Sequence, residues 1–560
     1  MGTMLLKTDI RTKGGTIKRS FDRATKVPEI TQGKLLSDIL KCNQKTQYGE
    51  EHAFSRISDA GTFSRAVPIC SFSDLAQYVE KMKNAEKNIL TADQPFMFNL
   101  TSGTTDKPKY VPITQGGMKL TANTSYQWLC RALRDHPSFL NHSILFVAGA
   151  PVEGQTRSGI PYGSASGMMC QALPDVLHPS YALPFALAKI KDYDLRYYVI
   201  ARIALENEVS FVLTPNPGTL IRIAETGIQH QEDIVRSIRD GVMCSAWPLE
   251  RTPEDSAILD IVGGSLRPNP ARARMLQQVI GRHGGLMPFA CWKKLKLIGC
   301  WLGGSIGFQA DKLSAYFGRD VSRRDIGYIA SEGVMTIPYE DESPAGILAL
   351  ENNYYEFIPD GESVEADAQV LKCHELEMGK QYRIILTNVN GLYRYDIHDT
   401  IEVCGFYNRT PVIAFVRKSD DMLNITGEKL HVNHFLEAFR RIKIRHDLSV
   451  VQACIVPNYK DLRHEILLRL NSSQSNEFLL DIILPLIDKV LSEVNIEYDA
   501  RRKSRRLNPP CLHMMDESWA DDVRGHFLKN QRADIQYKWR MLAEKITDVD
   551  ARHIQYTVAE

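Results

Sequence analysis

The chain has 560 residues, more than a single hydrophobic core usually organises, so we expect two or more packed units. Hydrophobic residues make up 44% and charged residues 24% of the sequence, as in ordinary globular proteins. The 68 Lys and Arg residues against 67 Asp and Glu residues leave a net charge of +1, which argues against a nucleic-acid-binding or membrane-binding surface.

Two further features concern the compartment in which the protein works. No apolar run approaches the roughly 20 residues that span a bilayer, and the N-terminal segment lacks a signal-peptide pattern. The 11 cysteines are scattered without a C-x-x-C pair, which favours free thiols over a disulfide or zinc framework. We therefore expect a cytoplasmic protein.

The first half of the chain alternates helical and strand patterns. Apolar residues recur at helical spacing in three stretches: 33–58, 73–87 and 117–133. Ser73 is a candidate N-cap of the second of these helices. Short apolar runs typical of buried strands stand at 96–99, 143–147 and 210–213.

From residue 295 onward, short apolar strands ended by Gly or polar turns become frequent. They cover 295–301, 325–330, 354–358, 383–386 and 400–404. This mixture predicts a mixed α/β fold with a β-rich section near 345–416. Beyond a polar stretch around Asp420, helix and strand patterns resume at 432–442, 450–456, 465–470 and 479–494. We predict a larger domain over 1–420 and a smaller α/β domain over 421–560.

A loop at 101–109, with the sequence TSGTTDKPK, is rich in hydrogen-bond donors. Five consecutive residues offer hydroxyl groups or an approachable backbone: Thr101, Ser102, Gly103, Thr104 and Thr105. Lys107 and Lys109 add positive charge, so the loop is suited to surround a phosphate. The loop lacks a Walker A pattern, and the alternative interpretation is a solvated Ser/Thr turn.

A second motif, Tyr-x-x-Ser-Glu-Gly, occupies 328–333 after a strand-like run. The ring of Tyr328 is able to stack on an adenine, and the carboxylate of Glu332 is able to hold a magnesium ion beside ATP phosphates. On its own this motif is a weak signal, and a structural role is the alternative.

Two later segments carry charged residues at short spacing. In the segment 391–399, GLYRYDIHD, the carboxylate of Asp399 is suited to accept hydrogen bonds from both hydroxyls of a ribose. The alternative is a solvent-exposed turn with a stacked tyrosine and arginine. Arg417 and Lys418 precede a Gly-Glu-Lys triplet at 427–429, where the alternative is a charged interdomain linker.

In this order and at these separations, the motifs resemble those of the Gretchen Hagen family of acyl-acid amido synthetases, in the adenylate-forming superfamily. Further matches are Asn-x-x-Thr-x-Tyr-Gly at 43–49, Val-Pro-Ile-x-x-Phe at 67–72 and Trp-x-Gly-Gly-Ser at 301–305. Asp106 stands where the superfamily often has glycine, and we expect it to face solvent. The resemblance implies β-sheets and a β-barrel flanked by helices, followed by a mobile C-terminal domain, as in firefly luciferase. The Tyr395-Asp396 pair is closer to bacterial members.

The resemblance also assigns roles to individual residues. Those implied to bind the nucleotide or the adenylate are Thr101, Ser102, Gly103, Thr104, Thr105, Lys109, Ser305, Tyr328, Ser331, Asp399 and Arg417. Those implied to act in catalysis are Lys418, Lys538 and Glu332, with Glu332 also the metal ligand. The resemblance also implies that the small domain rotates, so that an amine-binding surface replaces Lys538 at the adenylation site.

The expected reaction joins a small carboxylic acid to an amine or amino acid, with ATP and Mg²⁺ as cofactors. The acid and ATP form an acyl-adenylate and pyrophosphate, and the amine then displaces AMP. We expect a monomer or weak dimer, a role in specialised-metabolite or siderophore biosynthesis, and an apolar acyl pocket drawn from 120–135, 160–170 and 301–307.

Three alternatives remain open at this point. In the first alternative, the activated acid is transferred to coenzyme A or to a carrier-protein thiol. The first half-reaction is then the same. In the second, the Gly-x-Ser-x-Gly pattern around Ser305 forms the nucleophile elbow of an α/β-hydrolase. In the third, the chain is a non-catalytic nucleotide-binding scaffold.

Overall fold

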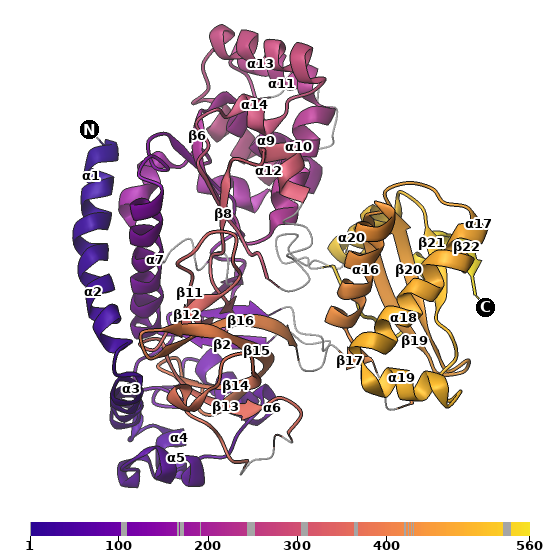
Figure 1. Cartoon of the computed structure of the whole chain (residues 1–560). Coiled ribbons are helices and arrows are strands. Elements are labelled where there is room, and N and C mark those ends of the chain that lie inside the picture. Colours follow the sequence, from indigo (N-terminus) through magenta and orange to yellow (C-terminus); the bar gives the residue numbers. More distant parts are fainter. Residues whose placement is uncertain are drawn as a thin grey trace. The chain divides into compact units, whose positions relative to one another are not determined.

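The computed structural model gives two compact units, Met1–Val416 and Arg417–Glu560, which are described separately (Figure 1). The described residues are 2–101, 109–164, 167, 173–190, 192–243, 252–303, 312–362, 364, 368–418, 422–423, 425–426, 428, 430–529 and 539–559.

The first unit begins with a series of helices. They are α1 (Gly2–Asp9), α2 (Gly15–Ala24), α3 (Pro28–Asn43), α4 (Gln47–Glu51), α5 (Ala60–Ala66) and α6 (Phe72–Lys83). α1 and α2 lie alongside the long helix α7 (Gln115–Asp135) (Figure 1), and the hydroxyl of Tyr126 in α7 donates to Asp9 Oδ2 at 2.9 Å.

Two of the predicted helices differ from those observed. The helix predicted over 33–58 ends at Asn43, because Thr46 Oγ1 accepts the N–H of Gly49 and caps a separate helix. A Cβ at Gly49 would lie 2.1 Å from Asn43 O, so this reversal requires glycine. The N-cap of α6 is Ser71 instead of Ser73, and the carboxylate of Asp74 accepts its N–H at 2.8 Å.

A four-stranded parallel sheet forms one layer of the first unit. Its order is β3 (Ser143–Phe146), β6 (Val209–Leu213), β7 (Leu297–Gly299) and β8 (Ser322–Arg324). Six helices join and cover these strands: α9 (Tyr193–Glu206), α10 (Pro217–Gln229), α11 (Gln231–Asp240), α12 (Pro253–Gly263), α13 (Pro270–His283) and α14 (Pro288–Cys291). The buried runs predicted at 143–147 and 210–213 are both strands of this sheet, β3 at its edge and β6 inside it.

A second four-stranded sheet carries the 101–109 loop. Its order is β2 (Lys109–Ile113), β1 (Met97–Thr101), β5 (Pro161–Ser164) and β4 (Gly154–Gln155). β1 and β2 pair antiparallel with Thr101 opposite Lys109, so the donor-rich loop connects the two strands of this hairpin. α7 follows β2 directly, and Thr114 Oγ1 caps it by accepting the N–H of Gly117 at 3.1 Å.

A six-stranded sheet forms the β-rich section predicted near 345–416. Its order is β11 (Thr336–Ile337), β12 (Gly346–Leu348), β16 (Thr410–Lys418), β15 (Tyr395–Tyr407), β14 (Gln381–Asn388) and β13 (Asn353–Pro359). In the described residues it is a half-barrel whose end strands are β11 and β13, and it corresponds to the β-barrel that the resemblance implies. A short hairpin of β9 (Ile329–Ala330) and β10 (Gly333–Val334) precedes it.

The second unit has its own sheet and core. Its strands are β19 (Val450–Asn458), β20 (Arg463–Leu470), β21 (Cys511–Met515) and β22 (Ile554–Val558), preceded by the hairpin β17 (Met422–Leu423) and β18 (Leu430–His431). Its helices are α16 (Val432–His446), α17 (Asn476–Phe478), α18 (Leu484–Val494), α19 (Ile496–Lys503), α20 (Trp519–Lys529) and α21 (Asp548–Arg552). The buried Glu428 carboxylate accepts a hydrogen bond from His464 Nε2 at 2.9 Å.

The mixed α/β fold class is confirmed. Within the described part of the chain, no helix combines the length and apolar content needed to cross a bilayer. Nine described cysteines carry free thiols, and six of them are buried.

Candidate active site

Tyr328 is held in a fixed position between the parallel sheet and the half-barrel. Its backbone N–H donates to Thr336 Oγ1 at 2.8 Å, and its ring lies 5.5 Å from that of Phe415. The preceding Gly327 has φ +107°, and a Cβ there would lie 2.7 Å from Thr336 O. Only glycine fits this approach, so the chain enters the 328–333 motif with a defined direction.

The hydroxyl of Tyr328 donates to Asp399 Oδ2 at 2.5 Å, which joins the second and third sequence motifs. Tyr328 is 9% and Asp399 3% exposed. Burial, and then the negative charge of Asp399, raise the pKa of Tyr328 well above its usual value, so it remains a protonated donor. A carboxylate has about four lone-pair sites, so Asp399 is able to accept further donors beyond this hydroxyl.

A bulge in β15 positions Asp399. Arg383 pairs with Thr400 and Ile385 pairs with Asp396, so two steps along β14 correspond to four steps along β15. Bulges of this kind redirect side chains and are common beside active sites. The strand predicted over 400–404 begins earlier, at Tyr395, so Asp399 lies inside β15 and the bulge allows pairing to continue on both sides.

Three side chains hold the bulge in shape. Arg383 Nε donates to Asp396 Oδ1 at 2.9 Å, and its Nη2 contacts the other Asp396 oxygen and lies 2.7 Å from His398 Nδ1. His398 has φ +60°, and its N–H donates to Asp396 Oδ1 at 2.9 Å. His398 therefore has a structural role in the bulge.

The strand that leads into the donor-rich loop contacts the 328–333 motif. Asn99 Nδ2 in β1 donates to the carbonyl oxygen of Ser331 at 3.1 Å, and Ser331 Oγ lies 3.5 Å from the carbonyl oxygen of Leu100. The end of β1, where Thr101 stands, is thus beside Ser331 and Glu332.

Glu332 is linked in turn to β14 and β15. Its carboxylate is 3.4 Å from the hydroxyl of Tyr395, and its carbonyl oxygen accepts from Asn388 Nδ2 at 2.9 Å. Glu332 is 7% exposed. The described parts of all three motifs therefore meet in one region of the first unit.

The 391–399 motif is buried, so the alternative of a solvent-exposed turn is wrong. The ring of Tyr393 stacks on that of Tyr48 at 4.9 Å, and the guanidinium of Arg394 pairs with the Glu356 carboxylate at 2.9 Å. Arg394 also donates to the carbonyl oxygens of Ser64 and Val67 at 2.9 and 2.8 Å. The N-terminal segments 43–49 and 67–72, which also carry family-like motifs, therefore contact this motif and help to hold it in place.

Several predicted site residues lie outside the described residues or are only partly described. These are Ser102, Gly103, Thr104, Thr105, Ser305 and Lys538, together with the side chain of Thr101; Asp106 is also among them. Lys109 is described, and its ammonium lies 5.8 Å from the ring centre of Phe72.

Arg417 and Lys418, the last residues of β16, belong to the second unit. In that unit, burial and then the charge of Arg417 lower the pKa of His434 to about 4. The neutral imidazole is therefore the form beside Arg417 at neutral pH.

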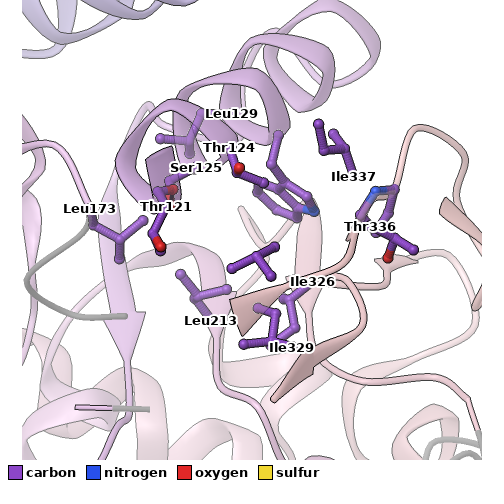
Figure 2. Close-up of a pocket in the computed structure, with 13 residues that line it drawn as sticks. Thr121, Thr124, Ser125, Leu129, Leu173, Leu213, Ile326, Ile329, Thr336 and Ile337 are labelled. Carbon is purple, nitrogen blue, oxygen red and sulfur yellow. Dashed lines mark hydrogen bonds between the residues drawn. The ribbon is translucent and has the colours of Figure 1, made fainter. Parts of the chain in front are cut away.

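A pocket lies between α7 and the segment 326–338 (Figure 2). Its lining residues are Thr121, Thr124, Ser125, Trp128, Leu129, Leu173, Leu213, Ile326, Ile329, Val334, Thr336, Ile337 and Pro338. The five residues from α7 fall within the predicted range 120–135. The same short segment thus provides both Tyr328 and a wall of this pocket.

Asp325 is a site residue that the sequence analysis missed. One carboxylate oxygen accepts the N–H of Leu302 at 2.7 Å, and the other accepts the N–H of Gly327 at 2.6 Å. Asp325 is 3% exposed, and burial raises its pKa to about 7 although the two N–H groups act in the opposite direction. Asp325 therefore links the segment after β7 to the segment that enters the 328–333 motif. This link depends on residues that are distant in the sequence, so no sequence pattern indicates it.

Comparison with known proteins places this geometry in context. A solved GH3.15 acyl acid amido synthetase superposes with a TM-score of 0.84 at 18% identity, covering 97% of this chain and 96% of that chain. A 2-hydroxyisobutyryl-CoA ligase in the postadenylation state matches with a TM-score of 0.52 at 10% identity, covering 93% and 90%. The fold is therefore that of the adenylate-forming ligases.

Sequence comparison is more specific. Residues 17–321 match the GH3 family N-terminal domain, and residues 346–418 match the GH3 family central domain. The jasmonoyl–L-amino acid synthetase GH3.5 of Oryza sativa subsp. japonica is 25% identical over 92% of this chain and 93% of its own length. A 4-substituted benzoates–glutamate ligase of Arabidopsis thaliana is 23% identical over 93% and 94%.

The chain belongs to the GH3 family. This confirms the predicted family and the predicted enzyme class, an acyl acid amido synthetase that forms a carbon–nitrogen bond. The alternatives of an α/β-hydrolase and of a non-catalytic scaffold are not retained.

Proposed function

We propose that the first unit binds ATP across the three converging motifs and uses it to adenylate a small carboxylic acid. The observation that carries this proposal is the hydrogen bond from Tyr328 to Asp399, together with the contacts of Asn99 and Ser331 between β1 and the 328–333 motif. They bring an aromatic ring, a buried carboxylate and the base of a donor-rich loop to one place.

Each residue has a physical task in this proposal. Asp399 accepts hydrogen bonds from the ribose hydroxyls, and the ring of Tyr328 lies along the adenine. The loop from Thr101 to Thr105, with Lys109 at its end, surrounds the phosphates with N–H and hydroxyl donors. Ser331 lies beside the end of β1 and helps to position this loop.

Glu332 is the proposed ligand of a magnesium ion that accompanies ATP. Magnesium is usually held by one or two carboxylates together with substrate phosphates, so a single carboxylate beside a phosphate loop fits. Among the described residues, no group of three His, Cys, Asp or Glu side chains forms a metal site by itself. When bound, the ion neutralises phosphate charge.

The pocket beside α7 is the proposed site of the acid. It shares the segment 326–338 with Tyr328, so an acid whose tail occupies it points its carboxylate toward the nucleotide. A carboxylate oxygen then attacks the α-phosphorus and pyrophosphate leaves. Positioning and stabilisation of the developing charge are what this step requires of the protein.

Transfer to the amine completes the proposed reaction. The nitrogen attacks the acyl carbon, loses a proton and displaces AMP. We propose Arg417, Lys418 and Lys538 as the cations that support adenylation, Ser305 as a residue that contacts the adenylate, and a rotation of the second unit between the two half-reactions.

Acid-dependent exchange of labelled pyrophosphate into ATP tests the first half-reaction. The proposal predicts exchange that requires both a carboxylic acid and Mg²⁺. Mass spectrometry with a mixture of amino acids and coenzyme A then separates an amide from a thioester. Tight ATP binding without exchange for any acid would contradict the proposal.

Four statements about the protein's setting stay predictions. They are a cytoplasmic location, a monomer or weak dimer, a bacterial branch of the family, and a role in specialised-metabolite or siderophore biosynthesis. Size-exclusion chromatography with light scattering tests the second of them directly.

A further inference from the structure

We infer that the acid taken by this site is compact, uncharged beyond its reacting carboxylate and mainly aliphatic, and that Gly299 sets the depth of the pocket it occupies. The inference rests on the proposed function, because it concerns the tail of the acid to be adenylated. It follows from the chemistry of the lining, the volume of the cavity and the packing around one glycine.

The lining side chains that the structure describes carry no charge. Aliphatic groups such as Leu213 and Ile326 form most of the wall (Figure 2), and Trp128 contributes an aromatic ring. Trp128 is fixed because its indole N–H donates to the carbonyl oxygen of Asp325 at 2.7 Å. Burying a second carboxylate against such a wall would leave its charge unpaired, so a polycarboxylate is disfavoured.

Three of the four described hydroxyl groups in the wall already donate within the protein. Thr121, Thr124 and Ser125 donate to the carbonyl oxygens of residues four positions earlier in α7, at 3.1, 3.1 and 3.2 Å. Thr336 Oγ1 accepts the N–H of Tyr328. Since the three hydroxyls of α7 already donate within the helix, the pocket has few donors left for polar groups on an acid tail.

The cavity is small. Its volume is about 40 Å³, which suits a short tail. A short branched alkyl tail fills such a space, whereas an aromatic ring or a long chain requires the lining to move.

Gly299, in β7, stands behind the wall. A Cβ added there would lie 2.8 Å from Leu213 Cδ1, and 3.4 Å from Ile326 Cγ2 and Trp128 Cη2. All three neighbours line the pocket. A side chain at residue 299 therefore displaces the wall, and Leu213, the closest neighbour with a flexible end, moves first.

A matched pair of acids tests the chemical class. In succinate, a carboxylate replaces the isopropyl group of 4-methylpentanoate, and the two tails have nearly the same size. Pyrophosphate exchange is expected to show a kcat/KM for 4-methylpentanoate roughly 100-fold above that for succinate. It should also exceed the values for phenylacetate and decanoate.

Variants test the role of Gly299. Gly299→Ala is expected to lower kcat/KM for 4-methylpentanoate roughly tenfold, with a smaller change for propanoate and an unchanged KM for ATP. Gly281→Ala is the matched control, because a Cβ at that helical glycine meets nothing within 4 Å. Leu213→Ala, which removes atoms from the same wall, should raise the relative rate with phenylacetate.

The possible outcomes separate the two proposals. Exchange that is faster with succinate, phenylacetate or decanoate than with 4-methylpentanoate overturns the inference and leaves the proposed function standing. Equal loss of activity with all acids in Gly299→Ala, together with unchanged preferences in Leu213→Ala, overturns the role of Gly299. Absence of exchange with every acid overturns the proposed function, and the inference with it.

Discussion

The two regions of the candidate site share the segment 326–338 but are built in opposite ways. On the proposed nucleotide side, Tyr328, Ser331 and Glu332 make buried polar contacts with β1, β14 and β15. On the acid side, Ile326 and Ile329 contribute apolar surface to the pocket. The first region depends on matched donors and acceptors, whereas the second depends on shape.

This difference predicts how each region tolerates change. Removing one partner of a buried hydrogen bond leaves the other unsatisfied and costs about 1–3 kcal/mol. A change of one methylene in an apolar pocket alters discrimination by a similar or smaller amount, without affecting the nucleotide. The nucleotide side is therefore expected to be intolerant of substitution, and the acid side adaptable.

The largest effect is expected for Asp399→Ala. The substitution removes the proposed ribose acceptor and the partner of the buried Tyr328 hydroxyl, so pyrophosphate exchange should fall about 100- to 1000-fold. Tyr328→Phe, which removes the hydroxyl and keeps the ring, should cost about tenfold. Thermal melting of both variants checks the fold. Near-normal exchange by Asp399→Ala would contradict the proposed role of Asp399 and the expected intolerance of the nucleotide side.

The next largest effect is expected for Glu332→Gln. Loss of the carboxylate weakens the proposed magnesium ligand, so exchange should fall about 100-fold and require more Mg²⁺ for half-maximal rate. Tyr395→Phe removes only the 3.4 Å contact of its hydroxyl with Glu332 and should leave the Mg²⁺ requirement nearly unchanged. Identical Mg²⁺ titrations for Glu332→Gln and the unmodified protein would show that Glu332 is structural.

Asp325 lies between the two regions, and Asp325→Asn should change the pH dependence of stability. Its folded-state pKa of about 7 exceeds the unfolded value of about 3.9, so the folded protein holds the extra proton and loses stability as pH rises from about 4 to about 7. The variant loses one N–H acceptor and should be about 1 kcal/mol less stable than the unmodified protein at pH 5.

At pH 8 the unmodified protein carries a buried charge at Asp325 and the variant does not, so the difference in stability should disappear. Denaturant unfolding at the two pH values measures both free energies. A deficit that stays constant, or grows, between pH 5 and pH 8 would show that burial does not raise the pKa of Asp325 in the folded protein.

The smallest effect is expected for Ile329→Val on the acid side. Ile329 is only partly buried, so removing one methylene should lower the free energy of unfolding by about 0.5 kcal/mol and change the KM for the acid a few-fold, with the KM for ATP unaltered. Steady-state exchange at varied acid and ATP gives both constants. A larger change in the KM for ATP than in the KM for the acid would contradict the assignment of Ile329 to the acid pocket.

Much of the fold could be predicted from the sequence because local patterns specify it. The apolar runs of β3 and β6, and the spacing of α7 and α16, were sufficient to locate these elements. Features that depend on distant partners could not be predicted. The end of α3 depends on the approach of Gly49 to Asn43, and the N-cap of α6 depends on whether Ser71 or Ser73 meets Asp74.

The same distinction applies to the site. Tyr328, Glu332 and Asp399 carry recognisable chemistry at recognisable spacing, so they could be selected in advance. The bulge that positions Asp399 arises from the pairing of β14 with β15, and the burial of Arg394 arises from Glu356 and a segment over 300 residues earlier. Asp325 carries no motif, and only its pairing with Leu302 and Gly327 gives it a role.

The most direct test of the central claim is a crystal structure of the protein with a non-hydrolysable ATP analogue. The account predicts that the ribose hydroxyls contact the carboxylate of Asp399, while the phosphates lie against the loop that contains Thr104. A nucleotide that contacts only one of these two elements, or that binds elsewhere in the chain, would contradict it.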